Sequence, residues 1–150
     1  LIINLEKLYL SLKKLELKDS NINEYYKLSH KLGIAQKDLN KLQNKLFGIE
    51  CNFEELNGLD FKKGCYVGQE NTARIKLKNK LTKRLLPIEI IKGKLKTEDE
   101  IFQNNQLIGK ILIDSEYPFG LIKFENVLNF LETCESTSAK IKFIKPVWIN

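Results

Sequence analysis

Apolar residues in the first part of the chain recur at spacings of three and four, which is the pattern of amphipathic α-helices. One such helix is predicted to begin near Leu5 and to end near Asp19-Ser20-Asn21, and a second is predicted over 23–32, ending at Gly33. A third is predicted from the N-cap Asp38 to Gly48. The leucines expected on the buried faces of the first and third helices are Leu5, Leu8, Leu12, Leu15, Leu39, Leu42 and Leu46.

In the second half of the chain the hydrophobic period changes to two, which is typical of half-buried β-strands. Apolar residues alternate with lysines over 75–81, and further strand patterns stand between turn residues. These strand segments are 85–91, 100–103, 106–114, 119–124 and 139–144. The Asn104–Asn105 pair suits a tight hairpin, because asparagine tolerates positive φ. We therefore predict an α+β fold, with a helical N-terminal half over 1–80 and a small antiparallel β-barrel over 81–150.

Composition narrows the class of protein. The chain has 150 residues, 43% of them hydrophobic, and no apolar run as long as a membrane span. Its net charge of +6 comes from lysine, which attracts polyanions without the bidentate geometry of arginine. Cys51, Cys65 and Cys134 lack the paired spacing of a zinc site, so we expect a reducing compartment and no metal centre. Methionine is absent, so we expect Leu1 to be the cut edge of a longer protein.

The densest group of functional side chains lies around two glycines. Within eight residues an amine, a thiol, an amide and a carboxylate follow one another, and the glycines allow the backbone to approach a ligand closely. The segment reads Lys63-Gly64-Cys65-Tyr66-Val67-Gly68-Gln69-Glu70. Lys63 and a helix predicted to start over 68–74 favour the thiolate form of Cys65, which attacks electrophiles or binds metal. The alternative is that Cys65 is a small buried hydrophobic residue.

This octapeptide is similar to the signature of the YgfZ-type folate-binding proteins, which serve iron–sulfur cluster assembly and are related to the aminomethyltransferase of glycine cleavage. The resemblance covers residues 24–125 and is strongest over 54–85. Similar stretches outside the octapeptide are Tyr26, His30–Ile34, Glu54-Glu55, Asn57–Lys62, Thr72–Arg74, Lys83–Leu85 and Leu107–Ile111. Such proteins carry a ferredoxin-like folate-binding half, so the resemblance implies that 1–80 is a truncated remnant of that half.

The resemblance also implies a cofactor and roles for the residues around it. Tetrahydrofolate is the implied cofactor, Cys65 the reactive or metal-touching group and Lys63 its electrostatic activator. Gln69, Glu70 and Arg74 are implied to orient the ligand, because amide and acidic side chains can pair with the edge of a pterin.

Each of these roles has a structural alternative. Tyr66 would stack on a pterin ring or pack beside Val67. Glu70 would bind the ligand or favour the first turn of a helix by charge–dipole attraction. The lysines of the basic run 74–84 would bind a polyanion or simply protect an edge strand from aggregation. His30, the single histidine, is expected to be a surface or hydrogen-bonded core residue.

We therefore expect a folate-dependent accessory factor for iron–sulfur cluster assembly or repair, without established enzymatic turnover. Its expected partners are folate and iron–sulfur client proteins or assembly machinery, with no membrane. The expected location is the bacterial cytoplasm, or the mitochondrial matrix in a eukaryote. Two alternatives stay open: a tetrahydrofolate-dependent aminomethyltransferase, and an RNA-binding module for tRNA modification. The second draws on the basic run, although the aromatic residues expected of single-strand binders are missing from it.

Overall fold

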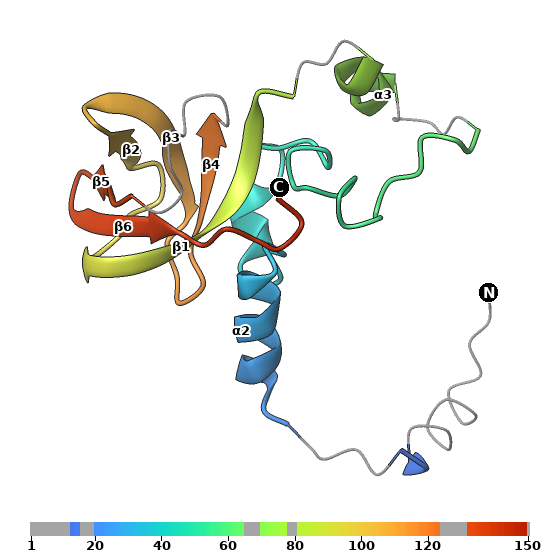
Figure 1. The fold of residues 1–150 in the computed structure, drawn as a ribbon, viewed down its shortest axis with the longest axis horizontal. Coiled ribbons are helices and arrows are strands. Elements are labelled where there is room, and N and C mark those ends of the chain that lie inside the picture. The colour runs from blue at the N-terminus through green and yellow to red at the C-terminus, as the bar shows by residue number, and fades with distance from the viewer. Residues whose placement is uncertain (1–12, 16–19, 65–69, 78–80, 124–131, 150) are drawn as a thin grey trace.

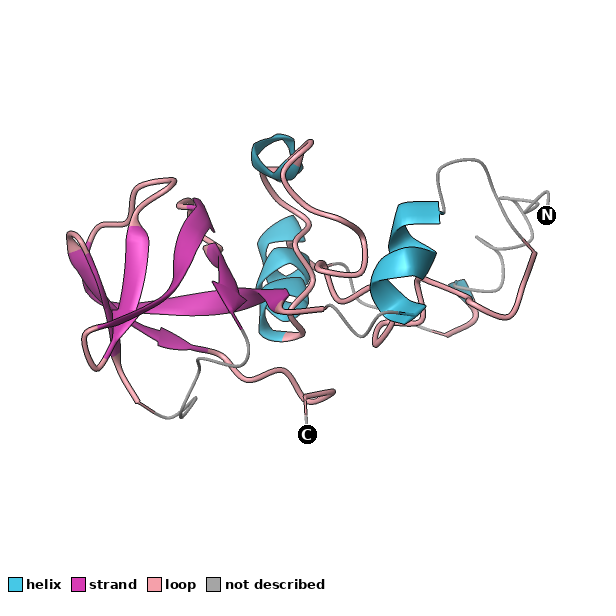
Figure 2. Ribbon diagram, turned by 90° about the horizontal axis from the view of Figure 1, so that it is seen from above, coloured by secondary structure: helices cyan, strands magenta, loops and turns pink. Residues whose placement is uncertain are grey.

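The computed structural model describes residues 13–15, 20–64, 70–77, 81–123 and 132–149. Six strands of this described part close into an antiparallel barrel in the order β1-β4-β3-β2-β5-β6 (Figure 1). They are β1 (Lys83–Gly93), β2 (Glu100–Gln103), β3 (Gln106–Ile113), β4 (Phe119–Lys123), β5 (Cys134–Ser136) and β6 (Ala139–Phe143). The helices α2 (Ile22–Lys31) and α3 (Glu70–Leu77) and the 3-10 helix η1 (Leu39–Leu42) lie to one side of the barrel (Figure 2).

Two apolar clusters organise the fold. The first fills the barrel with alternate residues of its strands, among them Leu86, Ile101 and Ile141, each essentially inaccessible to solvent. The second lies on the outer face of β1, β4 and β3, where the described segment 35–51 packs against it. Its members are Leu85, Leu112, Ile113, Phe119 and Leu121, covered by Ala35, Leu42, Leu46 and Cys51. Each face of this part of the sheet therefore carries a core of its own.

The predicted barrel is confirmed, and so are the five strand segments, whose ends agree with the structure to within two residues. Asn104 and Asn105 form the predicted hairpin, with φ of 50° and 63°. The short strand β5 was missed, because three residues are too few for a recognisable alternation.

The expected helical first half is not confirmed. The helix predicted over 38–48 is wrong: only the four residues of η1 are helical, and the side chain of Asp38 makes no capping hydrogen bond. Asp38 and Asn44 both have φ of 59°, which a right-handed helix does not accept. The strand predicted over 75–81 is also wrong where the structure describes it, because residues 75–77 belong to α3. The first predicted helix, from Leu5 to near Asp19-Ser20-Asn21, lies mostly outside the described residues.

The prediction of a helix ending at Gly33 is confirmed by α2. Asn21 caps its start, accepting a hydrogen bond from the Asn23 amide at 2.9 Å. At the other end Gly33 has φ of +77°, and a Cβ there would lie 2.8 Å from Cγ of Pro146. Trp148 donates from Nε1 to the Leu32 carbonyl at 2.9 Å. The C-terminal end of α2 is therefore held by residues near the end of the chain.

His30 anchors α2 to the turn between β3 and β4, which confirms the hydrogen-bonded core role. Its Nε2 donates to the Pro118 carbonyl at 2.9 Å, and its ring meets Phe119 edge-on with 5.1 Å between centroids. Tyr117 adds a second link, donating from its hydroxyl to the Asn23 carbonyl at 3.2 Å. Burial of the imidazole lowers the pKa of His30 below its ordinary value of 6.5.

We expect the stability of the protein to fall as the pH is lowered from 7.5 to 5.5. The folded-state pKa of His30 lies below that of the unfolded chain, so the unfolded chain takes up the proton first as the pH falls. Urea unfolding at several pH values measures this. His30→Gln keeps a hydrogen-bond donor but cannot titrate, so it should flatten the dependence; an unchanged slope in that variant would contradict the assignment.

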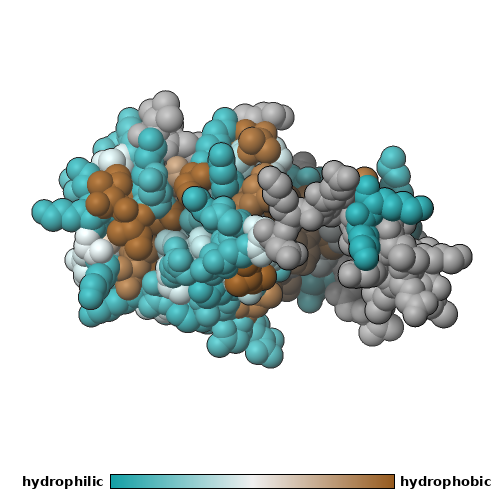
Figure 3. All heavy atoms as spheres, turned by 90° about the horizontal axis from the view of Figure 1, so that it is seen from below, coloured by the Kyte–Doolittle hydropathy of each residue, from teal (hydrophilic) through white to brown (hydrophobic). Residues whose placement is uncertain are grey.

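Figure 3 shows apolar patches broken up by hydrophilic side chains over one face of the barrel. No helix in the described part of the chain is long and apolar enough to cross a membrane. The division into domains over 1–80 and 81–150 stays a prediction, as does the ferredoxin-like origin of the first part.

Candidate functional site

The structure describes only part of the predicted site. Cys65, Tyr66 and Gln69 lie outside the described residues, so their predicted roles stay predictions. Glu70 is exposed and occupies the first turn of α3, as the charge–dipole alternative requires. Arg74 is exposed in the last turn of the same helix, and Lys63 is exposed just before the undescribed residues.

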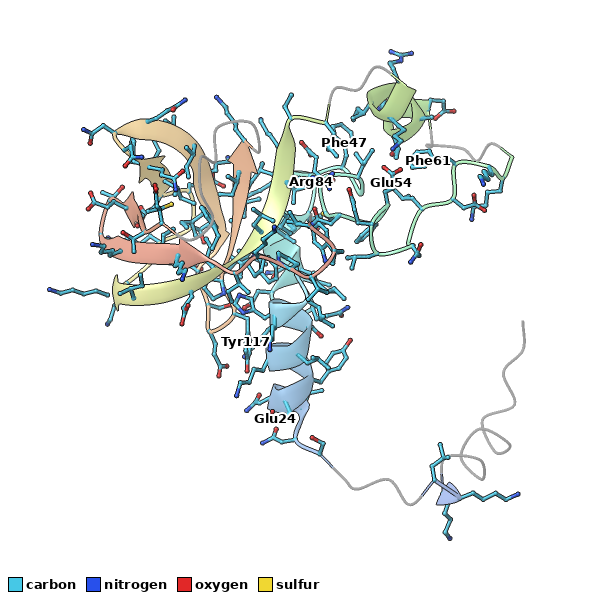
Figure 4. The ribbon with its side chains drawn as sticks, viewed as in Figure 1. Glu24, Phe47, Glu54, Phe61, Arg84 and Tyr117 are labelled. Atoms are coloured by element: carbon cyan, nitrogen blue, oxygen red, sulfur yellow. The ribbon has the colours of Figure 1, made fainter. Side chains whose placement is uncertain are left out.

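The residues on either side of the octapeptide meet in space. Lys76, on α3, pairs through Nζ with Oε1 of Glu54 at 2.5 Å. The same ammonium lies 5.8 Å from the centre of the Phe61 ring. Figure 4 shows Glu54 and Phe61 on the side of the loop that faces α3. Residues 61 and 76, which lie on either side of the octapeptide in the chain, are therefore close in space, and we call this contact its base.

A buried hydrogen-bond network joins this base to the barrel. Asn52 is fully buried and donates from Nδ2 to the Leu85 carbonyl at 2.7 Å, while the Leu85 amide donates to the Glu50 carbonyl at 2.8 Å. Arg84 donates to Oδ1 of Asn52 at 3.4 Å and pairs with Oε1 of Glu55 at 2.5 Å. The first residues of β1 thus fix the position of the segment that leads into the octapeptide.

A hollow of about 370 Å³ lies between this network and α3. Its apolar surface comes from Ile49, Ile75 and Leu81, and its charged groups are Glu54, Glu55, Lys76 and Arg84. The four charges form two ion pairs, so the hollow has little net charge. Oε2 of Glu55 is buried and accepts no hydrogen bond from the described residues.

Sequence reasoning did not select these hollow residues as a site. Glu54 and Glu55 were named only as parts of the family resemblance. Arg84 was named there and in the basic run, and Lys76 as a lysine of the basic run on a predicted edge strand. The strand role of Lys76 is wrong, because α3 carries it. No local signal could pair Glu55 with Arg84, since the contact joins residues far apart in the chain.

The two described thiols are poor nucleophiles. Cys51 packs against the outer cluster, and Cys134 is buried inside the barrel. Burial raises the pKa of each thiol to about 11, so both stay protonated near neutral pH. Within the described residues, no group of three or more histidine, cysteine or acidic side chains is placed to hold a metal ion. Neither of these two thiols is therefore activated in the structure.

Comparison with known proteins gives local similarity to one group of relatives, while no family model matches the chain. An iron–sulfur cluster assembly factor IBA57 homologue of Aspergillus oryzae is 39% identical over 61 residues, which is 41% of this chain and 14% of the relative. The homologue of Dictyostelium discoideum is 40% identical over 77 residues, 51% of this chain and 18% of the relative. That of Neurospora crassa is 43% identical over 56 residues, 37% of this chain and 13% of the relative.

The chain is therefore homologous, over part of its length, to iron–sulfur cluster assembly factors. The relatives are IBA57 homologues, the eukaryotic counterparts of the YgfZ-type proteins, and all three are described as mitochondrial. This agrees with the matrix location expected for a eukaryotic protein. The matches span 13% to 18% of the relatives' own length.

Proposed function

We propose that this chain acts in iron–sulfur cluster assembly or repair, as an accessory factor in the mitochondrial matrix. The observation that carries the proposal is the local identity of about 40% with IBA57 assembly factors. The octapeptide Lys63–Glu70, which is similar to the YgfZ-type signature, supports the same function. The proposed partners are the assembly machinery or its iron–sulfur client proteins.

Cys65 is the proposed reactive group, with Lys63 as its electrostatic activator. A cationic side chain two positions away and a helix that begins five positions later both favour a thiolate. The raised pKa values of Cys51 and Cys134 support this choice, because neither competes as a nucleophile near neutral pH. The base formed by Phe61, Lys76 and Glu54 would hold the Cys65 loop beside the barrel.

Tetrahydrofolate is the proposed cofactor, oriented by Gln69, Glu70 and Arg74 with Tyr66 against the pterin. The neighbouring hollow supports this, since it combines apolar surface with charged side chains that donate or accept hydrogen bonds. A pterin presents amino and amide donors beside a flat apolar ring, which suits such a surface.

We expect this chain alone to bind tetrahydrofolate weakly or not at all. A small ligand binds tightly when a pocket buries most of its surface, and the residues that resemble the family's pocket provide one wall of it. Calorimetric titration measures the affinity. Binding with a Kd near 1 µM, about −8 kcal/mol, would contradict the expectation and show that this wall suffices or that a dimer completes the pocket.

The two alternatives differ in what supports them. An aminomethyltransferase would use the same folate surface, and no additional observation favours it. RNA binding would use the basic run, but two of its cations are already engaged: Lys76 with Glu54, and Arg84 with Glu55. This reduces the positive charge available to phosphates.

A complementation experiment tests the proposed function. In cells that lack their own IBA57-like protein, the full-length reading frame should restore iron–sulfur enzyme activity, and Cys65→Ala should abolish the rescue. Cys51→Ala is the matched control, because it removes a thiol that stays protonated near neutral pH. Lys78→Ala combined with Lys80→Ala, two other lysines of the basic run, should leave rescue nearly intact. Rescue by Cys65→Ala but not by the double lysine variant would favour RNA binding instead.

A further inference from the structure

The outer face of the barrel is covered at one end and open at the other. The segment 35–51 covers the second apolar cluster on β1, β4 and β3. Beyond this cover lies a hollow of about 340 Å³. It is lined by Lys83, Glu98, Glu100, Leu107, Gly109, Lys110, Leu121 and Lys123. None of these residues belongs to the hollow beside the octapeptide.

The apolar floor of this outer hollow comes from two leucines. Leu121 is 8% exposed and continues the covered cluster, whereas Leu107, on β3, is 40% exposed. An exposed leucine by itself is ordinary, but here it lies in a depression whose floor is joined to an apolar cluster. The floor can therefore receive an apolar side chain without any rearrangement of the barrel.

The charges around the floor are distributed unevenly. At one end Glu98 pairs with Lys110 at 2.5 Å and with Lys45 at 2.8 Å. The second acid of the lining, Glu100, stands opposite Lys110 on the neighbouring strand. At the other end Lys83 and Lys123 stand directly opposite each other on β1 and β4. Neither forms an ion pair with an acid in the described part of the chain.

Like charges directly opposite each other destabilise a sheet, so this lysine pair opposes folding unless an anion is present. Lys92 and Lys140 form a second pair of lysines that stand opposite each other, on β1 and β6, but this pair has an acid beside it. There Glu135 stands directly opposite Lys140 on the neighbouring strand, so a local acid offsets the repulsion. Within the described strand register no acid stands opposite Lys83 or Lys123 on any neighbouring strand, and a carboxylate from outside would take that place.

The lining of the hollow favours a segment of a protein over a small molecule. An apolar floor lies beside two lysines that stand opposite each other on neighbouring strands, and this lining is complementary to an acidic segment that carries an apolar side chain. The barrel is closed, so it offers no free strand edge to which a peptide could add. A partner must therefore use side chains: one apolar residue on the leucine floor, and acidic residues beside the lysines.

We propose that this outer hollow binds an acidic segment of a partner protein, with one apolar side chain on Leu107 and Leu121 and carboxylates beside Lys83 and Lys123. The site is separate from the octapeptide and does not depend on the proposed iron–sulfur function. It would bring a partner to the same face of β1, β4 and β3 that supports the segment leading into the octapeptide.

A fluorescein-labelled peptide of four glutamates around one leucine tests the proposal by fluorescence anisotropy with the whole chain. Lys83→Glu combined with Lys123→Glu should weaken binding at least about tenfold. Lys92→Glu combined with Lys140→Glu is the matched control: it removes the same net charge from the other lysine pair and should change the affinity less than threefold. Amide NMR shifts on titration should cluster on β3 and β4.

Four outcomes would overturn the proposal. Equal weakening by both charge reversals would mean general attraction to a basic chain. Equal affinity for a peptide with serine in place of leucine would mean that no apolar anchor is used. Octanoate shifting the same amides while the peptide does not would mean a small-carboxylate site. Absence of peptide binding at low salt would exclude the docking surface altogether.

Discussion

At pH 7.5, iodoacetamide should label Cys65 at least about 20-fold faster than Cys51 or Cys134. Only about 0.03% of a thiol with a pKa of about 11 is ionised at that pH, against about 10% of an ordinary thiol with a pKa near 8.5. The more basic thiolate is also the stronger nucleophile, which reduces this ratio of about 300 to about 25. Burial of the other two thiols adds a steric barrier on top of the chemical one.

The measurement is a time course with site assignment by mass spectrometry. In 8 M urea the three thiols should label at similar rates, because the environments that raise two of the pKa values are then lost. Lys63→Met should slow labelling of Cys65 while leaving Cys51 unchanged. If Cys65 reacts no faster than Cys51 in the folded protein, the proposed activated thiolate is wrong.

Asn52→Gly should lower the free energy of unfolding by about 1–3 kcal/mol more than Asn57→Gly does. Both asparagines have positive φ, 65° and 57°, so glycine suits either backbone conformation. Asn52 is fully buried, and its side chain bonds to the Leu85 carbonyl and to Arg84. Asn57 is exposed, so its replacement changes little besides the flexibility of the unfolded chain.

Urea unfolding with fluorescence of Trp148 measures the difference between these two variants. Asn52→Gly should also loosen the segment that leads into the octapeptide, which hydrogen exchange at the Leu85 amide would report. Equal stability of the two variants would contradict the role given to the buried network.

The strands of the barrel could be predicted because their signals are local. There are three such signals: the alternation of apolar and polar residues, the turn residues between the strands, and the Asn104–Asn105 pair. Each acts over a few positions, and all three predict the same strands and turns. The helix predicted over 38–48 failed because leucine spacing indicates which residues are buried without requiring a helix. Leu42 and Leu46 do pack inward, but Leu39 is 50% exposed and Asn44 adopts a conformation that interrupts a helix.

The segment 75–81 failed for a related reason. Alternation of lysine with apolar residues over a few positions fits one turn of helix as well as a short strand, and residues 75–77 continue the helix that begins at Glu70. In the structure Lys76 of this segment forms an ion pair with Glu54. A pattern confined to 75–81 does not contain that partner.

The sequence by itself determined the barrel and the octapeptide with its reactive side chains, because both are written in short stretches of neighbouring residues. Only the tertiary structure decided that Lys76 lies against Phe61 on the other side of the octapeptide, and that Asn52 and Arg84 join the preceding segment to β1. It also decided which lysine pair faces an open apolar floor. These are contacts between residues distant in the chain, set by packing and strand register, and no local pattern specifies them.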